Sequence, residues 1–579
     1  MAAPQQVETP GGAFLLAGPA APAEPKDSDA QALGQAARDF VRERVLVRNA
    51  QLEAGDRALL RELVREAGTL GLLGAEIPTK HGGLGAPPAS ANAVVSGLGL
   101  HASFAVTAAA HLTIGAVPLL RHASPALCAE ILPAVATGER IGAYALTEPA
   151  SGSDALHLAT RAVERGGRYR LTGAKQFITN AAIADHFVIF ALIEGAGPTA
   201  FLVDARTPGL QLGKEERKLG LHGSSTCALY LDGAEVPAER VIGAIGHGHR
   251  VALDALTVGR HKLGVLASGH LELLLEVSAV YAAERRQFGR PIGELALVAE
   301  LLAESIAQAY ALQAVTTRAA PLCAPEVADL VAALPEAAMC KVIGSEALCA
   351  VADAALQIHG GLGYLRGTWV EQSYRDVRVN RIYEGTDEIN RRAIAQGLLR
   401  AIRRGKLDVA AAAGEAARVL VQGGAPPLDA GSARALAAHV RRLALVGLQA
   451  CSEHEGDSEP LEGALADLAI AAYAADSAAQ RAARAAETYA LHQAAAQLAC
   501  ARAVERAHAA YGLIAGRAGR PIPTRSLSLL DVAPTLDRAS VRPLLARAAL
   551  EAGRDPLAQY RPIRPPAPDA SHAPKGGTA

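Results

Sequence analysis

A change of hydrophobic period divides this chain into three parts. Before about residue 139, apolar residues recur at helical spacing, with one face formed by Leu33, Ala37, Phe40 and Val41. Between residues 140 and 246 the pattern becomes short apolar or alternating runs, such as 187–193 and 200–203, separated by Gly, Pro and Asp. Helical spacing returns after residue 247. The sequence therefore predicts a mainly α protein with a compact β domain in its middle.

Composition favours close-packed helices around that β domain. Half of the 579 residues are hydrophobic, yet aromatic residues make up only 4%, so Ala, Leu and Val fill most of the interior. Many alanines and few aromatics favour helices over sheets. The length is sufficient for two to four structural units with a large buried core.

Charge and cysteine usage exclude several classes of function. The 57 basic and 58 acidic residues nearly cancel, so nucleic acid is not expected as a partner. The seven cysteines form no Cys-x-x-Cys pair, which predicts buried thiols in a reducing compartment and neither a metal site nor a disulfide framework. We expect a cytoplasmic protein, because there is no secretory leader pattern and no run of about 18 apolar residues. Membrane association stays open, although the C-terminal block is not a basic interfacial helix.

Hydrophobic spacing and local composition together divide the chain into six predicted segments. Residues 1–30 are expected to be disordered, except that the apolar patch 11–16 could pack against the body. The N-terminal α domain then spans 31–139, the middle β domain 140–246 and a helical bundle 247–405. An extra helical domain follows at 406–561, in which Leu461, Leu465 and Leu468 repeat the helical spacing and residues 423–427 are a predicted linker. Residues 562–579 are Pro-rich and predicted to be a loose tail.

Residues 375–389, RDVRVNRIYEGTDEI, carry the strongest candidate for chemistry. Gly385 permits a sharp turn between two helices and leaves Glu384 at the junction, next to Ile382 and Tyr383. A carboxylate beside apolar neighbours loses hydration, which raises its pKa toward the range of a general base. The alternative for a lone Glu before a helix is a solvated or capping residue.

A second candidate is the segment 144–154, YALTEPASGSD. Here a predicted strand runs into a loop of hydroxyl groups and glycine, which can donate hydrogen bonds to a phosphate or to the edge of a heterocycle. Taken alone, such a loop is more often an ordinary connection.

Taken together, the motifs resemble the acyl-CoA dehydrogenase family. After 144–154 come KQFITN at 175–180, KLGLHGSST at 218–226, ERRQFG at 284–289, QIHGGLGY at 357–364 and YEGT at 383–386, in the order of that family. Any one motif is weak evidence, whereas ordered motifs at family-like spacing are specific. The resemblance covers residues 31–400, and the block from 406 on is similar to that of the long, very-long-chain-type branch.

The resemblance implies a fold of N-terminal helices, a β-barrel-like middle domain and a C-terminal helical bundle, with FAD as cofactor. It implies that Glu384 is the catalytic base and that Ser224, Glu384 and Gly385 contact the substrate. The residues implied to bind FAD are Tyr144, Leu146, Thr147, Gly152, Ser153, Phe177, Thr179, Arg285, Gln287, Phe288, Gln357, Gly360, Gly361, Thr386 and Glu388. Among these, Arg285, Gln287 and Phe288 are expected to reach the FAD of a neighbouring subunit.

The implied reaction is α,β-dehydrogenation of acyl-CoA thioesters, expected to be long-chain, in fatty acid β-oxidation. An electron-transferring flavoprotein is the implied electron acceptor, and a homodimer is the implied assembly. An acyl-CoA oxidase and a non-catalytic assembly or scaffold protein on the same fold remain alternatives.

The sequence departs from the family pattern in three places. Phe177 replaces the usual Trp, and Ala296 and Ala299 stand where a Gln pair is common. Gly259 occupies the position from which some relatives supply the base, which leaves Glu384 as the only candidate.

Overall fold

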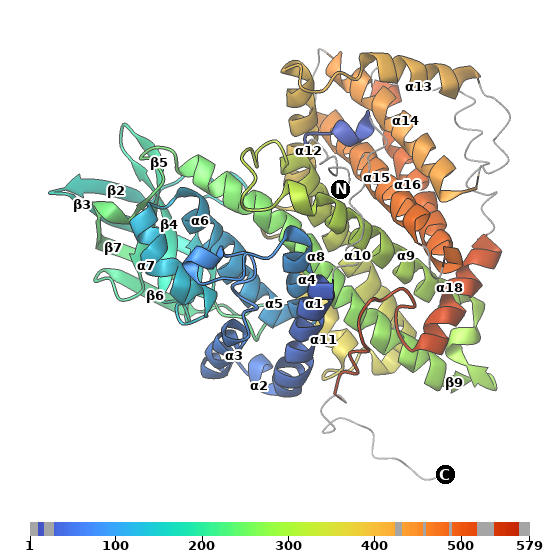
Figure 1. Cartoon of the computed structure of the whole chain (residues 1–579), viewed down its shortest axis with the longest axis horizontal. Helices are drawn as coiled ribbons and strands as arrows, with labels where there is room; N and C mark the ends of the chain where they lie inside the picture. The colour runs from blue at the N-terminus through green and yellow to red at the C-terminus, as the bar shows by residue number, and fades with distance from the viewer. Residues whose placement is uncertain are drawn as a thin grey trace, which may run out of the picture.

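The computed structural model describes residues 10–16, 28–422, 431–454, 459–485, 489–517 and 538–566. Its N-terminal part is a group of helices next to the sheet (Figure 1). The core of this part is built from Leu60, Leu63, Val64 and Phe104, all fully buried. Its helices are α1 (Ser28–Phe40), α2 (Asn49–Glu53), α3 (Arg57–Thr69), α4 (Pro88–Leu98), α5 (Ala102–Ala109), α6 (Val117–His122) and α7 (Pro125–Ala136).

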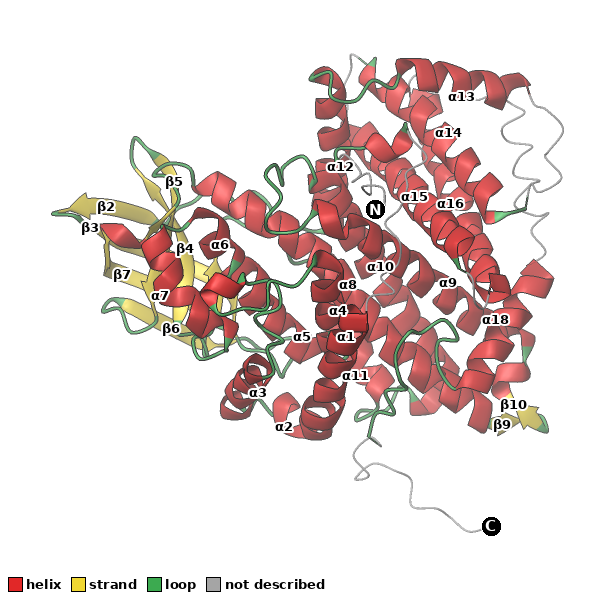
Figure 2. Cartoon of the chain, viewed as in Figure 1, coloured by secondary structure: helices red, strands yellow, loops and turns green. Residues whose placement is uncertain are grey.

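The middle of the chain forms one eight-stranded sheet at one end of the molecule (Figure 2). The strand order is β6-β7-β3-β2-β4-β5-β8, and β1 pairs in parallel with β4. This sheet confirms the predicted β domain. The strands are β1 (Gly142–Ala145), β2 (Arg161–Arg165), β3 (Arg168–Thr179), β4 (His186–Ile193), β5 (Gly197–Asp204), β6 (Leu210–Glu215), β7 (Thr226–Pro237) and β8 (Val241–Ile242).

Long helices follow the sheet and form the centre of the molecule (Figure 1). A small hairpin of β9 (Arg286–Gln287) and β10 (Arg290–Pro291) extends from the end of the first of these helices. Alanine and leucine on facing sides keep the helices closely packed, as the composition predicted. The helices are α8 (Gly248–Glu284), α9 (Ala296–Ala319), α10 (Leu334–His359), α11 (Trp369–Val377) and α12 (Asp387–Arg403).

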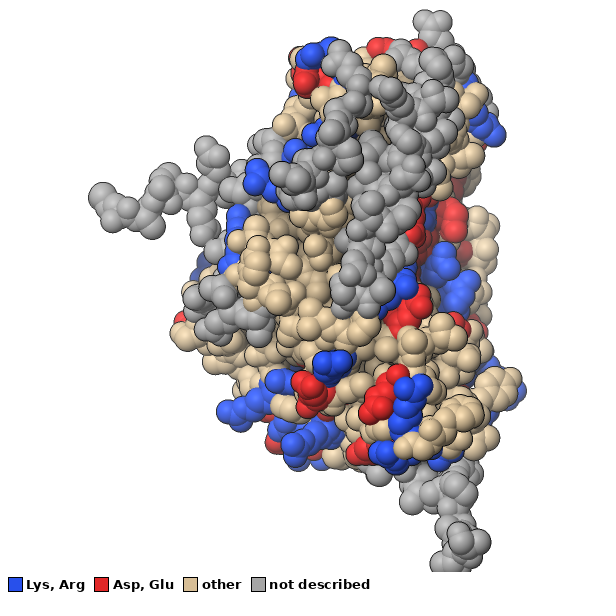
Figure 3. Space-filling model, turned by 90° about the vertical axis from the view of Figure 1, so that its right-hand side faces the viewer, with Lys and Arg blue, Asp and Glu red and all other residues tan. Residues whose placement is uncertain are grey.

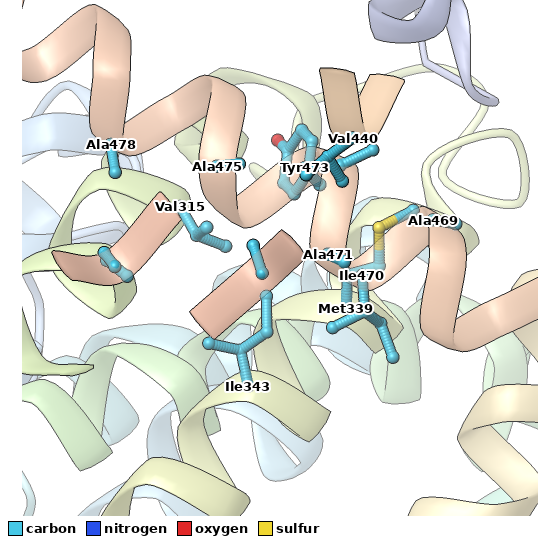
Figure 4. Close-up of a cluster of buried hydrophobic side chains, with 14 of the residues drawn as sticks. Val315, Met339, Ile343, Val440, Ala469, Ile470, Ala471, Tyr473, Ala475 and Ala478 are labelled. Atoms are coloured by element: carbon cyan, nitrogen blue, oxygen red, sulfur yellow. The ribbon is translucent and has the colours of Figure 1, made fainter. Parts of the chain in front are cut away.

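The C-terminal block packs against this bundle and shares its hydrophobic core. Figure 4 shows Val315 of α9 and Met339 and Ile343 of α10 beside Ile470 and Tyr473 of the block. The predicted boundary at 405/406 therefore does not separate two cores. The helices of the block are α13 (Ala410–Gln422), α14 (Ala433–Ser452), α15 (Glu459–Arg484), α16 (Tyr489–Arg517) and α18 (Arg538–Ala552). The predicted linker at 423–427 lies outside the described residues.

The apolar patch near the N-terminus is inserted between the bundle and the C-terminal block. The backbone N–H groups of Gly11 and Gly12 both donate to Oε1 of the buried Glu336, at 3.0 and 2.8 Å. Phe14 is 1% exposed and meets the Tyr473 ring edge-on, with ring centroids 4.8 Å apart. The segment thus bridges residues more than 300 positions away in the sequence.

The beginning of the predicted loose tail is held in place, which corrects that prediction for residues 562–566. Ile563 is 5% exposed, and its N–H donates to Oε2 of Glu276 at 2.7 Å. The carbonyl of Pro566 accepts a 3.0 Å hydrogen bond from the Trp369 indole N–H. A proline-rich segment without regular structure can still be fixed when buried side chains satisfy its backbone.

Two described helical stretches have an apolar composition that suits a membrane span, Ala102–His122 and Gly248–Glu284. Their most apolar windows are 78% and 89% buried inside the protein, which is typical of core helices. On the face drawn in Figure 3, the described basic and acidic side chains are interspersed. This distribution agrees with the even charge balance of the sequence.

Candidate active site

Glu384 lies in the segment 382–386, which connects the 3₁₀ turn Arg378–Arg381 after α11 to the start of α12. Glu384 and Gly385 both have a left-handed backbone, with φ of +52° and +85°. Thr386 caps α12, because its hydroxyl accepts a 3.3 Å hydrogen bond from the Ile389 N–H. Only glycine adopts left-handed φ without cost, so surrounding contacts must hold Glu384 in this conformation.

The carboxylate of Glu384 is buried although the residue as a whole is partly exposed. Its Oε2 atom has no hydrogen-bond partner among the described residues. A Cβ added to Gly259 of α8 would lie 2.4 Å from that oxygen, so the carboxylate packs directly against the bare glycine. Burial raises the pKa of Glu384 to about 7, while the positive charges of Arg260 and Lys341 act in the opposite direction. A carboxylate with a near-neutral pKa can exchange a proton at physiological pH.

Buried polar groups hold the turn from three helices. Lys341 of α10 donates to the Gly385 carbonyl at 2.9 Å and to Asp387 Oδ1 at 2.7 Å. Asn390 of α12 donates to the Gly385 carbonyl at 2.8 Å, and Arg260 of α8 donates to the Glu384 carbonyl at 3.3 Å. Lys341, Asn390 and Arg260 were not predicted. Lys341 has no motif beside it, whereas Asn390 directly follows the segment 375–389 and Arg260 follows Gly259, which were the available signals.

The loop 144–154 is fixed by an ion pair inside the sheet. Lys175 of β3 and Glu148 have side chains 0% and 1% exposed, and Nζ lies 2.6 Å from Oε1. Lys175 also donates to the Leu146 carbonyl at 3.2 Å, and the Ala159 N–H donates to Glu148 Oε2 at 2.6 Å. These contacts set the path of the loop, which leaves Gly152 and Ser153 exposed.

Two predicted site residues, Phe177 and Thr179, lie at the end of β3. Phe177 is 58% exposed and has a left-handed backbone, with φ of +59°. Thr179 is partly exposed, and the adjacent Asn180, also left-handed at +68°, donates to the carbonyls of Thr107 and Gly142. This irregular end of β3 is a short stretch where the sheet exposes an aromatic ring.

The residues of the sheet fit a large planar cofactor with phosphates. The hydroxyl of Tyr144 on β1 is buried without a hydrogen-bond partner among the described residues, and its side chain lies close enough to Glu384 for their charges to interact. Phe177 offers an exposed ring for stacking, and nothing lies within 4 Å of a Cβ placed on Gly152. Thr147, half-buried, and Ser153 supply hydroxyl groups at the same loop.

A second group of predicted cofactor residues lies far from the sheet. Arg285 caps the end of α8, and Gln287 and Phe288 follow it in the β9–β10 hairpin, at the opposite end of the molecule (Figures 1 and 2). All three are exposed, Phe288 at 89%. Gln357, Gly360 and Gly361, at the end of α10, are exposed as well. Within one chain these residues do not join the site around Glu384.

The remaining predicted residues differ in accessibility. Ser224 is 1% exposed and accepts a 3.1 Å hydrogen bond from Thr107, so its hydroxyl is not open to a substrate in this structure. Leu146 is buried in the core beside the sheet. Gly385 and Thr386 are partly exposed and Glu388 is exposed, all at the beginning of α12. No group of three or more potential metal ligands occurs among the described residues.

Three family models match successive parts of the chain. Residues 27–139 match the acyl-CoA dehydrogenase N-terminal domain, 143–234 the middle domain and 246–399 the C-terminal domain. The matched ranges contain Glu384, the loop 144–154 and the β9–β10 hairpin.

Similar proteins and a similar solved structure are also named acyl-CoA dehydrogenases. A probable acyl-CoA dehydrogenase of Bacillus subtilis is 39% identical over 399 residues, which are 65% of this chain and 66% of the relative. Human short-chain and very long-chain specific acyl-CoA dehydrogenases are 35% and 34% identical, over 64% and 56% of this chain and 90% and 51% of their own lengths. An acyl-CoA dehydrogenase of Bacillus anthracis, solved in complex with FAD, superposes with a TM-score of 0.87 at 31% identity. That superposition covers 94% of this chain and 100% of the other, so it includes the C-terminal block.

The fold and the site together define a flavoprotein oxidoreductase with FAD as cofactor. The chain belongs to the acyl-CoA dehydrogenase family. The match confirms the fold class and the family that the motifs indicated. The roles of individual residues stay predictions.

Proposed function

We propose that this chain catalyses α,β-dehydrogenation of acyl-CoA thioesters, with Glu384 as the base that removes the α-proton. The observation that carries the proposal is the Glu384 carboxylate, which is buried, lacks a hydrogen-bond partner at Oε2 and has a pKa raised to about 7. An unsatisfied buried carboxylate is unfavourable in the folded protein, and such groups occur where a reacting proton has to be accepted.

The residues of the chain bind, orient and deprotonate the substrate. Bound FAD would supply the two-electron acceptor for the β-hydrogen. Glu384 takes the α-proton, and its backbone N–H polarises the thioester carbonyl, which lowers the pKa of the α-C–H group. Gly259 gives the carboxylate the space from which it reaches that proton. Phe177 and Tyr144 would hold the ring of the cofactor, and Gly152 and Ser153 would hold its phosphates.

We propose further that the electrons leave to an electron-transferring flavoprotein, that the enzyme acts in fatty acid β-oxidation in the cytoplasm, and that it is a homodimer. The separation of the β9–β10 hairpin from the sheet supports the dimer, because Arg285, Gln287 and Phe288 can contact FAD only on another subunit. Short-chain and very long-chain relatives are about equally similar to this chain, so the long-chain preference rests on the C-terminal block alone.

The test is the visible spectrum of the purified protein under anaerobic conditions. Saturated acyl-CoA thioesters of increasing chain length should bleach the flavin, and an electron-transferring flavoprotein should restore its colour. Rapid peroxide formation in air would instead identify an oxidase. A colourless protein, or a yellow one that no thioester bleaches, would contradict the proposal and favour a non-catalytic role.

A further inference from the structure

The turn that carries Glu384 is held by a buried charge network whose members, Lys341 and Asp387, are not among the residues predicted to react. Lys341 and Asp387 both have side chains 1% exposed, and Nζ lies 2.7 Å from Oδ1. The Ser345 hydroxyl contacts both oxygens of Asp387, at 2.9 and 3.0 Å, and Arg381 donates to Oδ2 at 3.0 Å. The carboxylate of Asp387 is therefore saturated with donors, and its position is fixed.

The ammonium of Lys341 reaches beyond this pair to the turn itself. It donates to the carbonyl of Gly385, the second left-handed residue, which also accepts from Asn390. Two donors on one carbonyl fix the orientation of the peptide that follows the base. Because Glu384 pays a conformational cost for its own left-handed backbone, a relaxed turn would carry its carboxylate away from Gly259.

Lys341 also acts on Glu384 by its charge. The charged and titratable groups that face the Glu384 carboxylate are Arg260 from α8, Lys341 from α10, Tyr144 from β1 and the adjacent Tyr383. Arg260 and Lys341 are the two that favour the ionised carboxylate, against the effect of burial. A buried ion pair is weak evidence of stabilisation, because desolvation offsets much of the attraction between the charges. A role in the site explains better why this pair lies directly beneath the turn.

We propose that Lys341 is a positioning residue for the Glu384 base, which it holds through the Gly385 carbonyl and Asp387 and on which it acts through its positive charge. The inference rests on the proposed function, since it assumes that Glu384 is the base. Lys341 does not touch the substrate. It governs where the carboxylate lies and at which pH the carboxylate is ionised.

The test compares the pH dependence of anaerobic flavin reduction in four purified flavoproteins: the unaltered protein and the Lys341→Met, Lys341→Arg and Asp387→Asn variants. Lys341→Met removes the positive charge, so the midpoint pH of flavin reduction should rise by about one unit. Lys341→Arg retains the charge and should keep the midpoint within a few tenths of a unit, even where the rate falls. Asp387→Asn leaves the charge of Lys341 unneutralised and should move the midpoint down.

Lys262→Met is the matched control. Lys262 is 2% exposed and pairs with Glu76 at 2.6 Å, but does not contact the turn. Its loss destabilises the fold in a similar way and should leave the midpoint unchanged. If the role of Lys341 were purely structural, Lys341→Met and Asp387→Asn would lower the rate or the stability, but they would not shift the midpoint pH of flavin reduction in opposite directions. Unchanged midpoints in folded, flavin-containing variants would overturn the proposal, and if Lys341→Met does not fold, the downward shift of Asp387→Asn decides.

A second measurement separates this inference from the proposed function. The Tm of each protein is compared with that of the same protein carrying Glu384→Gln, from pH 5 to 9. The difference between the two Tm values grows above about pH 4.5, where the unfolded chain ionises, and levels off where Glu384 ionises in the folded protein. The pH of this plateau therefore reports ionisation of Glu384 without turnover, and Lys341→Met should raise it. If no thioester bleaches the flavin, the proposed function fails, while this shift still supports the effect of Lys341 on Glu384. An identical divergence with and without Lys341 would refute that effect.

Discussion

A Cβ on Gly259 would stand 2.4 Å from Oε2 of Glu384 and 2.9 Å from Oε1, so the carboxylate occupies the space that a side chain at 259 would fill. Gly259 of α8 has no side chain, and the carboxylate from the turn before α12 fills the space that this leaves. The sequence showed only that Gly259 could not supply a base. The structure shows that Gly259 also makes room for the Glu384 carboxylate.

Gly259→Ala should therefore displace the Glu384 carboxylate and lower the rate of flavin reduction about 100-fold, with FAD retained, because a misplacement of about 1 Å costs this much. Stopped-flow reduction by an acyl-CoA provides the measurement. Gly463→Ala on α15 is a suitable control, since nothing lies within 4 Å of its added Cβ. Normal kinetics in Gly259→Ala would show that the carboxylate works from another position.

Glu384→Gln should retain FAD and lower the rate of flavin reduction by about 10²- to 10⁴-fold, the usual range for loss of a general base. The amide has the same shape but cannot take the proton. The rate and the flavin absorbance are measured on the same preparation, with the exposed Glu139→Gln as control. Bleaching of Glu384→Gln close to the rate of the unaltered protein would contradict the assignment.

Stability should depend on pH through the same group. Because the pKa of Glu384 is raised from 4.5 to about 7 in the folded chain, the fold favours the protonated form. Its favourable contribution is fully present below about pH 4.5 and is lost as pH rises through about 7. Glu384→Gln stays neutral, so its Tm should equal that of the unaltered protein below about pH 4.5 and exceed it by a few degrees at pH 8. The opposite trend, with the variant less stable at pH 8, would mean that the carboxylate is stabilised in its charged form.

Arg285→Ala should lower FAD content and weaken subunit association together, because the exposed hairpin has no access to the site of its own chain. Light scattering at several dilutions, combined with the ratio of flavin to protein absorbance, measures both. Arg517→Ala, an exposed arginine at the end of α16, is a control outside the hairpin. A fully flavinated monomer would rule out the shared site.

Truncation after residue 405 should cause aggregation, because it uncovers Val315, Met339 and Ile343 on α9 and α10 (Figure 4). All residues predicted to act in catalysis would remain. Size-exclusion chromatography and flavin content provide the readout. A soluble, flavin-containing dimer with undiminished flavin reduction would show that the block is an accessory domain.

The sequence predicted the parts of the fold and site that have local causes. Gly385 marks the turn, and the runs at 187–193 and 200–203 are β4 and β5. The strand predicted to run into the loop 144–154 is β1, but its parallel pairing with β4, more than 40 residues away, could not be predicted from its four uniformly buried residues. Lys341 could not be found either, because a lysine within an apolar helix gives no sign of a buried partner on another helix.

The two ends of the chain bear on how it folds. The segment containing Phe14 is synthesised hundreds of residues before its partners Glu336 and Tyr473. At the other end, Ile563 closes onto Glu276 of a helix made long before. The contact of the N-terminal segment with Tyr473 cannot form before residue 473 is synthesised, and that of Glu276 cannot form before residue 563 is synthesised. Pulse proteolysis of refolding protein should find the N-terminal segment protected last, after the sheet and the bundle, and a nascent chain stalled near residue 400 should still expose that segment to protease.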